Sequence, residues 1–245
     1  IHIESGLRSF NREMPEEINR VLTDHVSTYL FCASQDSIKN LANEGISNNV
    51  HLVGDVMLDV NNFYIKKAEK EFDIKKYDIK NNDFVLVTLH RQESVDIKER
   101  LETLLNALAE INKTQSVIFP IHPRTKKMVK EFNLEYLLDG ICLIEPVGYI
   151  EMLSLISASV MVLTDSGGLQ KEAVYNNKFC VILRKETEWV EIIDNGMGII
   201  AGYNFETIIQ SYEENKNKVF NKKLDCYGKG DAAIKILSTI LKDIS

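Results

Sequence analysis

Short apolar runs alternate with amphipathic segments along nearly the whole chain. Helical spacing of apolar residues falls between the runs, as in Ile97–Ile111. Such alternation is typical of parallel βαβ units with right-handed crossovers, so the sequence predicts an α/β fold of doubly wound, Rossmann-like sheets. The predicted strands lie near Tyr29–Ala33, Val50–Val53, Phe84–Leu89, Val117–Ile121, Ile141–Ile144, Val160–Leu163, Cys180–Leu183 and Gly198–Ile200.

A polar, charged and weakly periodic stretch, residues 73–83, interrupts this alternation. It predicts a linker between a first domain in residues 1–72 and a nucleotide-binding, doubly wound domain in residues 84–225. A further helix, roughly Asp231–Ile244, is predicted in the last segment, residues 226–245.

The run Thr164–Glu172 leads from a predicted strand into a helix through two adjacent glycines. Gly167 and Gly168 allow the backbone to approach an anion, which unpaired N–H groups and the positive helix end would hold. Ser166 adds a hydroxyl donor, and Glu172 lies where a carboxylate can accept hydrogen bonds from a ribose diol. A plain strand-to-helix turn that needs only glycine flexibility is the alternative.

Two other strands are predicted to deliver polar residues to the same edge. Phe84–Leu89 is followed by His90 and Arg91, and the strand that ends at Ile121 is followed by His122. Ligands of open α/β sheets bind beyond the carboxyl ends of the strands, where these side chains suit acid–base chemistry or phosphate binding. The alternative is a capping cluster for the next helix.

The N-terminal segment places Glu4 close to Arg8, and a helix is predicted to open with Pro15 at its first position. Glu16 and Arg20 stand four residues apart on this helix and can pair on one face. Such a pair is often only a helix brace, but its closeness to Glu4 and Arg8 favours the wall of an active site.

Composition restricts the function classes. The chain has 245 residues, 44% of them hydrophobic, and a net charge of −7, which argues against a nucleic-acid surface. No apolar run approaches the roughly 20 residues of a membrane span, and no signal peptide is visible. The four cysteines lie far apart without metal-ligand spacing, which is typical of reduced thiols in a cytoplasmic protein.

Four segments together resemble the non-hydrolysing UDP-N-acetylglucosamine 2-epimerases, in order and in approximate spacing. They are His2–Arg8, Pro15–Arg20, Leu89–Ser94 and Asp165–Glu172. The resemblance implies two Rossmann-like domains of the glycosyltransferase-B type, with roughly 100 residues of the first domain missing. It also implies that the last helix crosses back to the first domain, that the full-length protein is a homodimer, and that the chain as given is an inactive fragment.

The resemblance further implies epimerisation at C2 of a UDP-2-acetamido sugar in polysaccharide biosynthesis. UDP leaves C1 as a proton leaves C2, and it adds back to the glycal after reprotonation from the other face, without a cofactor or metal. Glu4, Glu16 and His90 are then the catalytic candidates. The candidates for substrate binding are Arg8, Arg20, His122, Ser166, Gly167, Gly168 and Glu172.

One departure leaves the substrate open. Thr187-Glu188-Trp189 has tryptophan where many family members have arginine, and Trp189 either packs in the core or stacks on a ligand. Together with Glu145–Tyr149, it looks closer to enzymes that act on UDP-2,3-diacetamido-2,3-dideoxyglucuronic acid. A UDP-sugar glycosyltransferase of the same fold and a non-catalytic nucleotide-sugar sensor are the rival classes.

Overall fold

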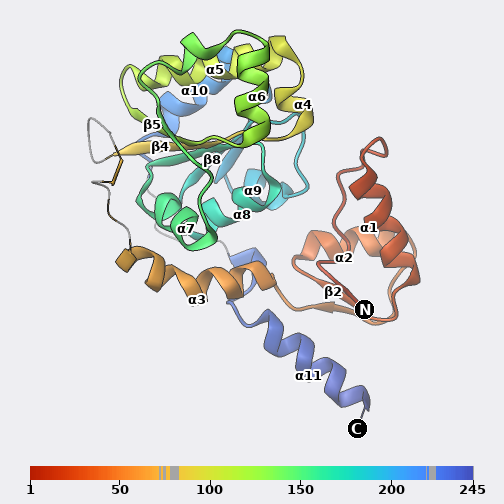
Figure 1. Ribbon diagram of the computed structural model, residues 1–245. Helices are drawn as coiled ribbons and strands as arrows, with labels where there is room; N and C mark the ends of the chain where they lie inside the picture. The colour runs from red at the N-terminus through yellow and green to blue at the C-terminus, as the bar shows by residue number, and fades with distance from the viewer. Residues whose placement is uncertain (72, 74–75, 78–82, 219, 221–224, 245) are drawn as a thin grey trace. The chain divides into compact units, whose positions relative to one another are not determined.

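The computed structural model describes residues 1–71, 73, 76–77, 83–218, 220 and 225–244 (Figure 1). The chain divides into two compact units, which are described separately. Unit 1 comprises Ile1–Phe63 and Leu224–Ser245, and unit 2 comprises Tyr64–Lys223. Most of the predicted linker, residues 73–83, lies outside the described residues. No helix in the described part of the chain is long and apolar enough to cross a membrane.

Unit 1 contains a three-stranded parallel sheet in the order β1-β2-β3. The division between the units falls inside its helix α3. Its elements are β1 (His2–Ile3), α1 (Pro15–Val26), β2 (Leu30–Cys32), α2 (Gln35–Asn43), β3 (Val50–Leu52), α3 (Val56–Glu71), η3 (Asp225–Tyr227) and α11 (Ala232–Ile244).

Both faces of strand β2 are buried because its side chains alternate between two apolar clusters. Leu30 and Cys32 pack with Leu41 of α2 on one face. Phe31 packs with Ile236 of α11 on the other face. The final helix, in which apolar residues recur at helical spacing, therefore contacts this face of the sheet through Ile236 and Ile240.

Unit 2 contains a six-stranded sheet in the order β6-β5-β4-β7-β8-β9, and every neighbouring pair is parallel. All eight strands predicted from apolar runs are present in the two units, and β1 is additional. The strands of unit 2 are β4 (Phe84–Thr88), β5 (Ser116–Pro120), β6 (Cys142–Ile144), β7 (Met161–Thr164), β8 (Phe179–Ile182) and β9 (Gly198–Ile200). Its helices are α4 (Gln92–Val95), α5 (Lys98–Asn112), α6 (Pro123–Glu131), η2 (Glu135–Leu138), α7 (Tyr149–Ala158), α8 (Gly167–Tyr175), α9 (Val190–Asp194) and α10 (Phe205–Asn215).

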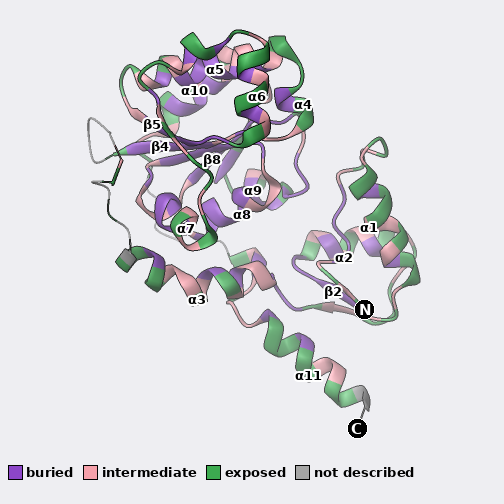
Figure 2. Cartoon of the chain, viewed as in Figure 1, coloured by how far each residue is buried: buried purple, intermediate pink, exposed green. Residues whose placement is uncertain are grey.

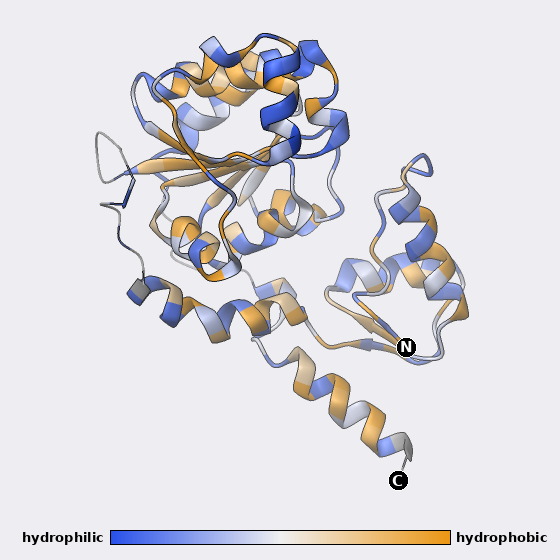
Figure 3. Ribbon diagram, viewed as in Figure 1, coloured by the Kyte–Doolittle hydropathy of each residue, from blue (hydrophilic) through white to orange (hydrophobic). Residues whose placement is uncertain are grey.

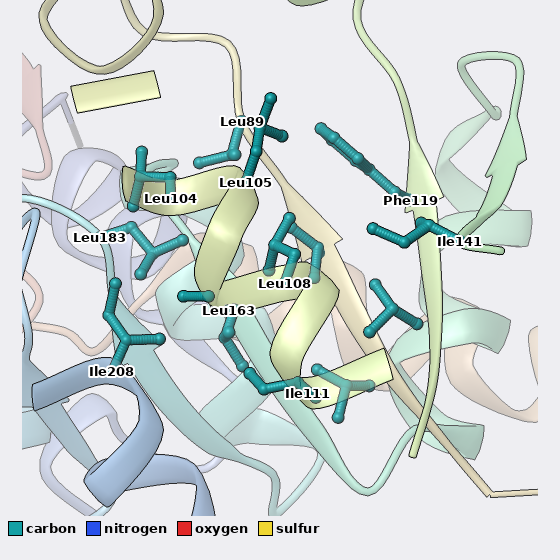
Figure 4. Packing of buried hydrophobic residues seen from close by; sticks show 14 of the residues in the cluster. Leu89, Leu104, Leu105, Leu108, Ile111, Phe119, Ile141, Leu163, Leu183 and Ile208 are labelled. Atoms are coloured by element: carbon teal, nitrogen blue, oxygen red, sulfur yellow. The ribbon is translucent and has the colours of Figure 1, made fainter. Parts of the chain in front are cut away.

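Helices cover both faces of this sheet, so strands β4, β5, β7 and β8 are almost entirely buried (Figure 2) and largely apolar (Figure 3), whereas the edge strands β6 and β9 are partly exposed. Residues of β4 alternate between the two cores: Val85 and Val87 face the cluster that contains α5, whereas Phe84 and Leu86 face the cluster that contains α7 and α8. In Figure 4, α5 presents Leu104, Leu105, Leu108 and Ile111 to the first core.

The chain order of unit 2 reverses at strand β4. The chain proceeds from β4 to β5 and β6 on one side and then returns to place β7 against the other side of β4. Open α/β sheets bind ligands at the carboxyl ends of the strands beside such a reversal. The topology therefore points to the residues that follow β4, β5 and β7, the three strands for which the sequence predicts a common polar edge.

Candidate functional site

Strand β7 leads into helix α8 through Asp165 and Ser166. The hydroxyls of Thr164 and Thr88 share a 2.6 Å hydrogen bond that joins the ends of β7 and β4. Ser166 is the N-cap of α8, yet its side chain makes no capping hydrogen bond. The first N–H groups of α8 therefore receive no acceptor from the cap residue, an arrangement that suits an anion.

Gly167 begins α8 outside the left-handed region of the backbone. A Cβ atom here would stand 3.6 Å from Nε1 of Trp189, and 3.9 Å from both a guanidinium nitrogen of Arg91 and a carboxylate oxygen of Glu188. These are ordinary van der Waals distances. Neither backbone strain nor crowding within the protein therefore requires a glycine at this position.

His90, two residues after the end of β4, is held by the fully buried carboxylate of Asp165. Asp165 accepts the backbone N–H of His90 at 3.0 Å and that of Arg91 at 2.9 Å, and its Oδ1 lies 3.3 Å from Nδ1 of the His90 ring. Burial lowers the pKa of His90, Asp165 opposes this effect, and His122 and Arg91 add to it. The ring is therefore mostly neutral at pH 7 and can accept a proton.

His122 lies beside His90, with their ring centroids 5.8 Å apart. It is also the N-cap of α6, and its Nδ1 accepts the N–H of Arg124 at 3.2 Å. His122 therefore has a structural role at the start of α6. Both histidines line a cavity of about 190 Å³ with Thr88, Leu89, Pro120, Pro146, Val147, Met152, Ser166 and Leu169.

Glu172 lies on the second turn of α8 and is only 7% exposed. Burial raises the pKa of its carboxyl group to about 7, although the charge of Lys171 and a hydrogen bond from Tyr149 both favour the ionised form. An acid that is half-ionised near neutral pH is uncommon outside functional sites.

Trp189 is buried, and its ring lies under the ammonium group of Lys171, with Nζ 3.9 Å from the centroid. The side chain of Lys171 is also fully buried, so this cation–π contact is desolvated and strong. The structure thus places Trp189 in the interior, next to the α8 turn, as the core interpretation predicts.

In unit 1, Arg8 is a structural brace in the described conformation. Its guanidinium donates to Asp24 at 2.7 Å and to both carboxylate oxygens of Glu44, at 2.6 and 2.8 Å. Burial opposes the charge, but these hydrogen bonds raise the pKa of Arg8. With its side chain 1% exposed, Arg8 is directed into the protein rather than toward a ligand.

The predicted pairing of Glu16 with Arg20 is replaced by a different ion pair. Arg20 contacts Glu17 at 3.1 Å, while Glu16 is exposed. Glu17 is buried, and its carboxylate accepts hydrogen bonds from the backbone N–H groups of Ser9 and Phe10. Glu16 is left exposed in the first turn of α1.

Glu4 adopts a left-handed backbone conformation, with φ at 68°, which is uncommon for a residue with a side chain. Asp24 holds a residue on each side of Glu4. It accepts the N–H of Gly6 at 3.1 Å and contacts Nδ1 of His2 at 2.6 Å. The strained position is therefore fixed by its neighbours, as is common for residues in functional sites.

Of the predicted residues of unit 2, His90, His122 and Ser166 line one cavity at the edge formed by β4, β5 and β7, and Gly167, Gly168 and Glu172 follow Ser166 on α8. The other four predicted residues belong to unit 1. Three organising carboxylates, Asp24, Glu17 and Asp165, are absent from the sequence-based candidates. Only the position of Asp165, two residues before the glycine pair, offered a signal. Among the described residues, no group of three or more His, Cys, Asp or Glu is arranged to hold a metal ion.

Comparison with known proteins agrees with this geometry. Residues 1–241 match the family model described as UDP-N-acetylglucosamine 2-epimerase. A UDP-N-acetylglucosamine 2-epimerase homolog of Methanococcus maripaludis is 44% identical over 98% of this chain and 68% of its own length. The UDP-2,3-diacetamido-2,3-dideoxy-D-glucuronate 2-epimerase of Pseudomonas aeruginosa is 41% identical over 98% of this chain and 67% of its own length.

A solved structure of the Methanocaldococcus jannaschii UDP-GlcNAc 2-epimerase, in complex with UDP-GlcNAc and UDP, superimposes with a TM-score of 0.89. It is 42% identical and covers 98% of this chain and 68% of its own. The chain thus spans about two thirds of the length of these relatives.

Proposed function

The chain belongs to the UDP-N-acetylglucosamine 2-epimerase family, and from this we propose that unit 2 binds the UDP portion of a UDP-2-acetamido sugar that the protein epimerises at C2. One observation carries the proposal. The uncapped α8 turn lies beside His90 at the carboxyl edge of one parallel sheet, next to its chain reversal, and the same helix carries the buried Glu172.

Each part of UDP has a complementary group in unit 2. The N–H groups of Gly167 and Gly168 and the hydroxyl of Ser166 bind the diphosphate, with the positive end of α8 behind them. The carboxylate of Glu172 accepts hydrogen bonds from the ribose hydroxyls. The cavity between Pro146, Val147 and Met152 has apolar walls that suit a planar base.

The reaction requires two kinds of assistance. The C1–O bond breaks with its electron pair on the departing UDP, which the α8 N–H groups stabilise. The C2 proton leaves to a base, and the C–H electrons form the C1–C2 double bond of a glycal. Return of a proton to the opposite face of C2, with addition of UDP at C1, completes the epimerisation.

Three side chains are assigned to this acid–base work, with His90 at the junction of phosphate and sugar. Its neutral ring, held by Asp165, donates to or accepts from the phosphate or the sugar. Glu4 and Glu16 supply the carboxylates at the sugar. Arg8, Arg20 and His122 are secondary: Arg8 and His122 already have structural contacts, and Arg20 pairs with Glu17.

Two UDP-2-acetamido sugars are candidates for the substrate. UDP-N-acetylglucosamine is our first assignment, with UDP-N-acetylmannosamine as the product. The diacetamido glucuronate is the alternative, because one relative of 41% identity carries that name. The family match favours both over a glycosyltransferase, for which the Glu4 and Glu16 carboxylates would have no use.

The nucleotide assignment is tested by calorimetry of UDP with this chain. The wild-type chain is expected to bind UDP, and Glu172→Ala is expected to weaken binding by roughly 1–3 kcal/mol because the ribose hydroxyls lose their acceptor. Glu206→Ala removes an exposed glutamate from the first turn of α10 and is the matched control, with unchanged affinity. Equal affinities for Glu172→Ala and the wild type would refute the ribose role.

A further inference from the structure

Phe10 combines an exposed ring with a strained backbone. Its φ angle is 58°, in the left-handed region, and its side chain is 76% exposed. A single exposed apolar side chain is common on protein surfaces, but a bulky residue in the left-handed region is a genuine outlier. Packing does not repay the strain, because most of the ring lies in solvent. Folding stability alone therefore does not explain the conformation of Phe10.

The other left-handed residues show how selective this feature is. Among the described residues, three of the non-glycine positions with positive φ are asparagines, Asn49, Asn133 and Asn177. Asparagine tolerates this region because its short polar side chain bonds to the local backbone. The remaining two are Glu4 and Phe10, which lie close together in the sequence. Since Glu4 is a proposed catalytic carboxylate, backbone strain of this kind coincides with the proposed sugar site.

The buried carboxylate of Glu17 holds Phe10 in its conformation. Oε1 accepts the N–H of Phe10 at 3.0 Å, and Oε2 accepts the N–H of Ser9 at 2.9 Å and its hydroxyl at 3.0 Å. Arg20 also donates to Oε2, at 3.1 Å. These hydrogen bonds use the acceptor capacity of a carboxylate that is only 2% exposed. The backbone of Phe10 is thus fixed to the first turn of α1, next to Glu16.

We propose that Phe10 is a specificity-determining residue, whose ring packs against the acetamido group at C2 of the bound sugar. The inference rests on the proposed function, in which Glu4 and Glu16 act at C2. The acetamido group is attached to that same carbon, so an apolar side chain held beside Glu16 is suited to cover its methyl group. The exposed ring surface of Phe10 is then removed from water when the sugar binds.

Calorimetry with this chain compares the affinities for UDP, UDP-glucose and UDP-N-acetylglucosamine. UDP-glucose has a hydroxyl group at C2, so its comparison with UDP-N-acetylglucosamine isolates the acetamido group. Phe10→Ala removes the ring and keeps the Cβ atom, whereas Phe10→Gly also relieves the backbone. Phe63→Ala, at a phenylalanine of α3 that is likewise 76% exposed, is the matched control for loss of an exposed ring.

The wild type should bind UDP-N-acetylglucosamine more tightly than UDP-glucose. Both Phe10 variants should bind UDP-N-acetylglucosamine about three- to tenfold more weakly, the order expected for uncovering one or two apolar carbon atoms. They should bind UDP and UDP-glucose like the wild type, and Phe63→Ala should follow the wild type with all three ligands. Three results would overturn the inference: an unchanged affinity of the Phe10 variants for UDP-N-acetylglucosamine, an equal loss for all three ligands, or no preference of the wild type for the acetamido sugar.

Urea unfolding without ligand tests whether the ring serves folding instead. Glycine adopts the left-handed region without strain, so Phe10→Gly should raise the urea midpoint of unit 1, followed by the amide signal of the buried Phe31. Phe10→Ala should keep the wild-type midpoint. Asn49→Gly, at an exposed left-handed residue of unit 1, is the control and should change the midpoint less.

A lower midpoint for both Phe10 variants would show that the ring supports folding, and it would overturn the inference. Failure of the wild type to bind any of the three ligands would instead refute the proposed function. Binding of UDP by the wild type, without an effect of the Phe10 variants on the acetamido sugar, would refute the role of Phe10 and leave the nucleotide site in place.

Discussion

The buried carboxyl group of Glu172 makes folding stability depend on pH. Its pKa is about 7 in the folded chain against 4.5 for an exposed glutamate. The folded state therefore binds the proton more tightly, and the stabilisation present below pH 4.5 is lost as the pH rises through 7. Glu172→Gln should accordingly stabilise the chain at pH 8.5 by up to roughly 3 kcal/mol and change little at pH 4.5.

Urea unfolding of the wild type and Glu172→Gln at both pH values checks this expectation. The glutamine keeps the size and shape of the side chain, so the comparison isolates the charge. Equal stability differences at the two pH values would show that Glu172 is not an acid with a raised pKa.

Single residues were predictable where a motif contained them and unpredictable where long-range pairing decided their role. The glycine turn and Glu172 follow from a short pattern. Arg8 was a candidate for substrate binding or for a structural brace, and the fold surrounds it with Asp24 and Glu44, which are 16 and 36 residues away in the sequence. Isolated carboxylates carry no periodic signal that reveals such partners.

At the scale of elements, one substitution in helix α8 can change the affinity for UDP without lowering the folding stability. Gly167→Ala places a Cβ at ordinary contact distances from its protein neighbours, so it should leave stability unchanged or raise it by about 0.4–1 kcal/mol. The same methyl group occupies the space proposed for the diphosphate. UDP binding should therefore weaken by roughly 1–3 kcal/mol, the usual penalty of overpacking.

Gly198→Ala provides the contrasting control. A Cβ at Gly198 would stand 2.8 Å from the backbone oxygen of Cys180 and 2.8 Å from a methyl carbon of Ile192. This variant should lower the urea midpoint. Unimpaired UDP binding by Gly167→Ala would mean that the ligand does not approach the α8 turn.

Element positions were predictable to the extent that apolar runs were long. Each predicted strand is present, since buried strands of a parallel sheet are continuously apolar. Strand β1 has only two residues, too few to produce a pattern. The order β6-β5-β4-β7-β8-β9 arises from pairing between distant segments, so the sequence indicated the common polar edge but not the neighbours of each strand.

At the scale of the whole molecule, the proposed catalytic groups come from both units: Glu4 and Glu16 from unit 1, and His90 from unit 2. The relatives that are named as epimerases are longer, and this chain spans about two thirds of them. The proposed reaction is therefore best tested in a chimera, in which the N-terminal part of the Methanocaldococcus jannaschii relative precedes Ile1.

The chimera is incubated with UDP-N-acetylglucosamine in deuterated water, and the C2 proton is followed by NMR. We expect loss of the C2 signal with appearance of the manno epimer, and much slower exchange by the chain alone. His90→Ala and Glu16→Gln should each reduce exchange about 10²–10⁴-fold, the usual contribution of a general acid or base. Glu13→Gln, at a neighbouring exposed glutamate, should exchange like the unmodified chimera. Near-normal exchange by the first two variants would show that the protons at C2 are moved by other groups.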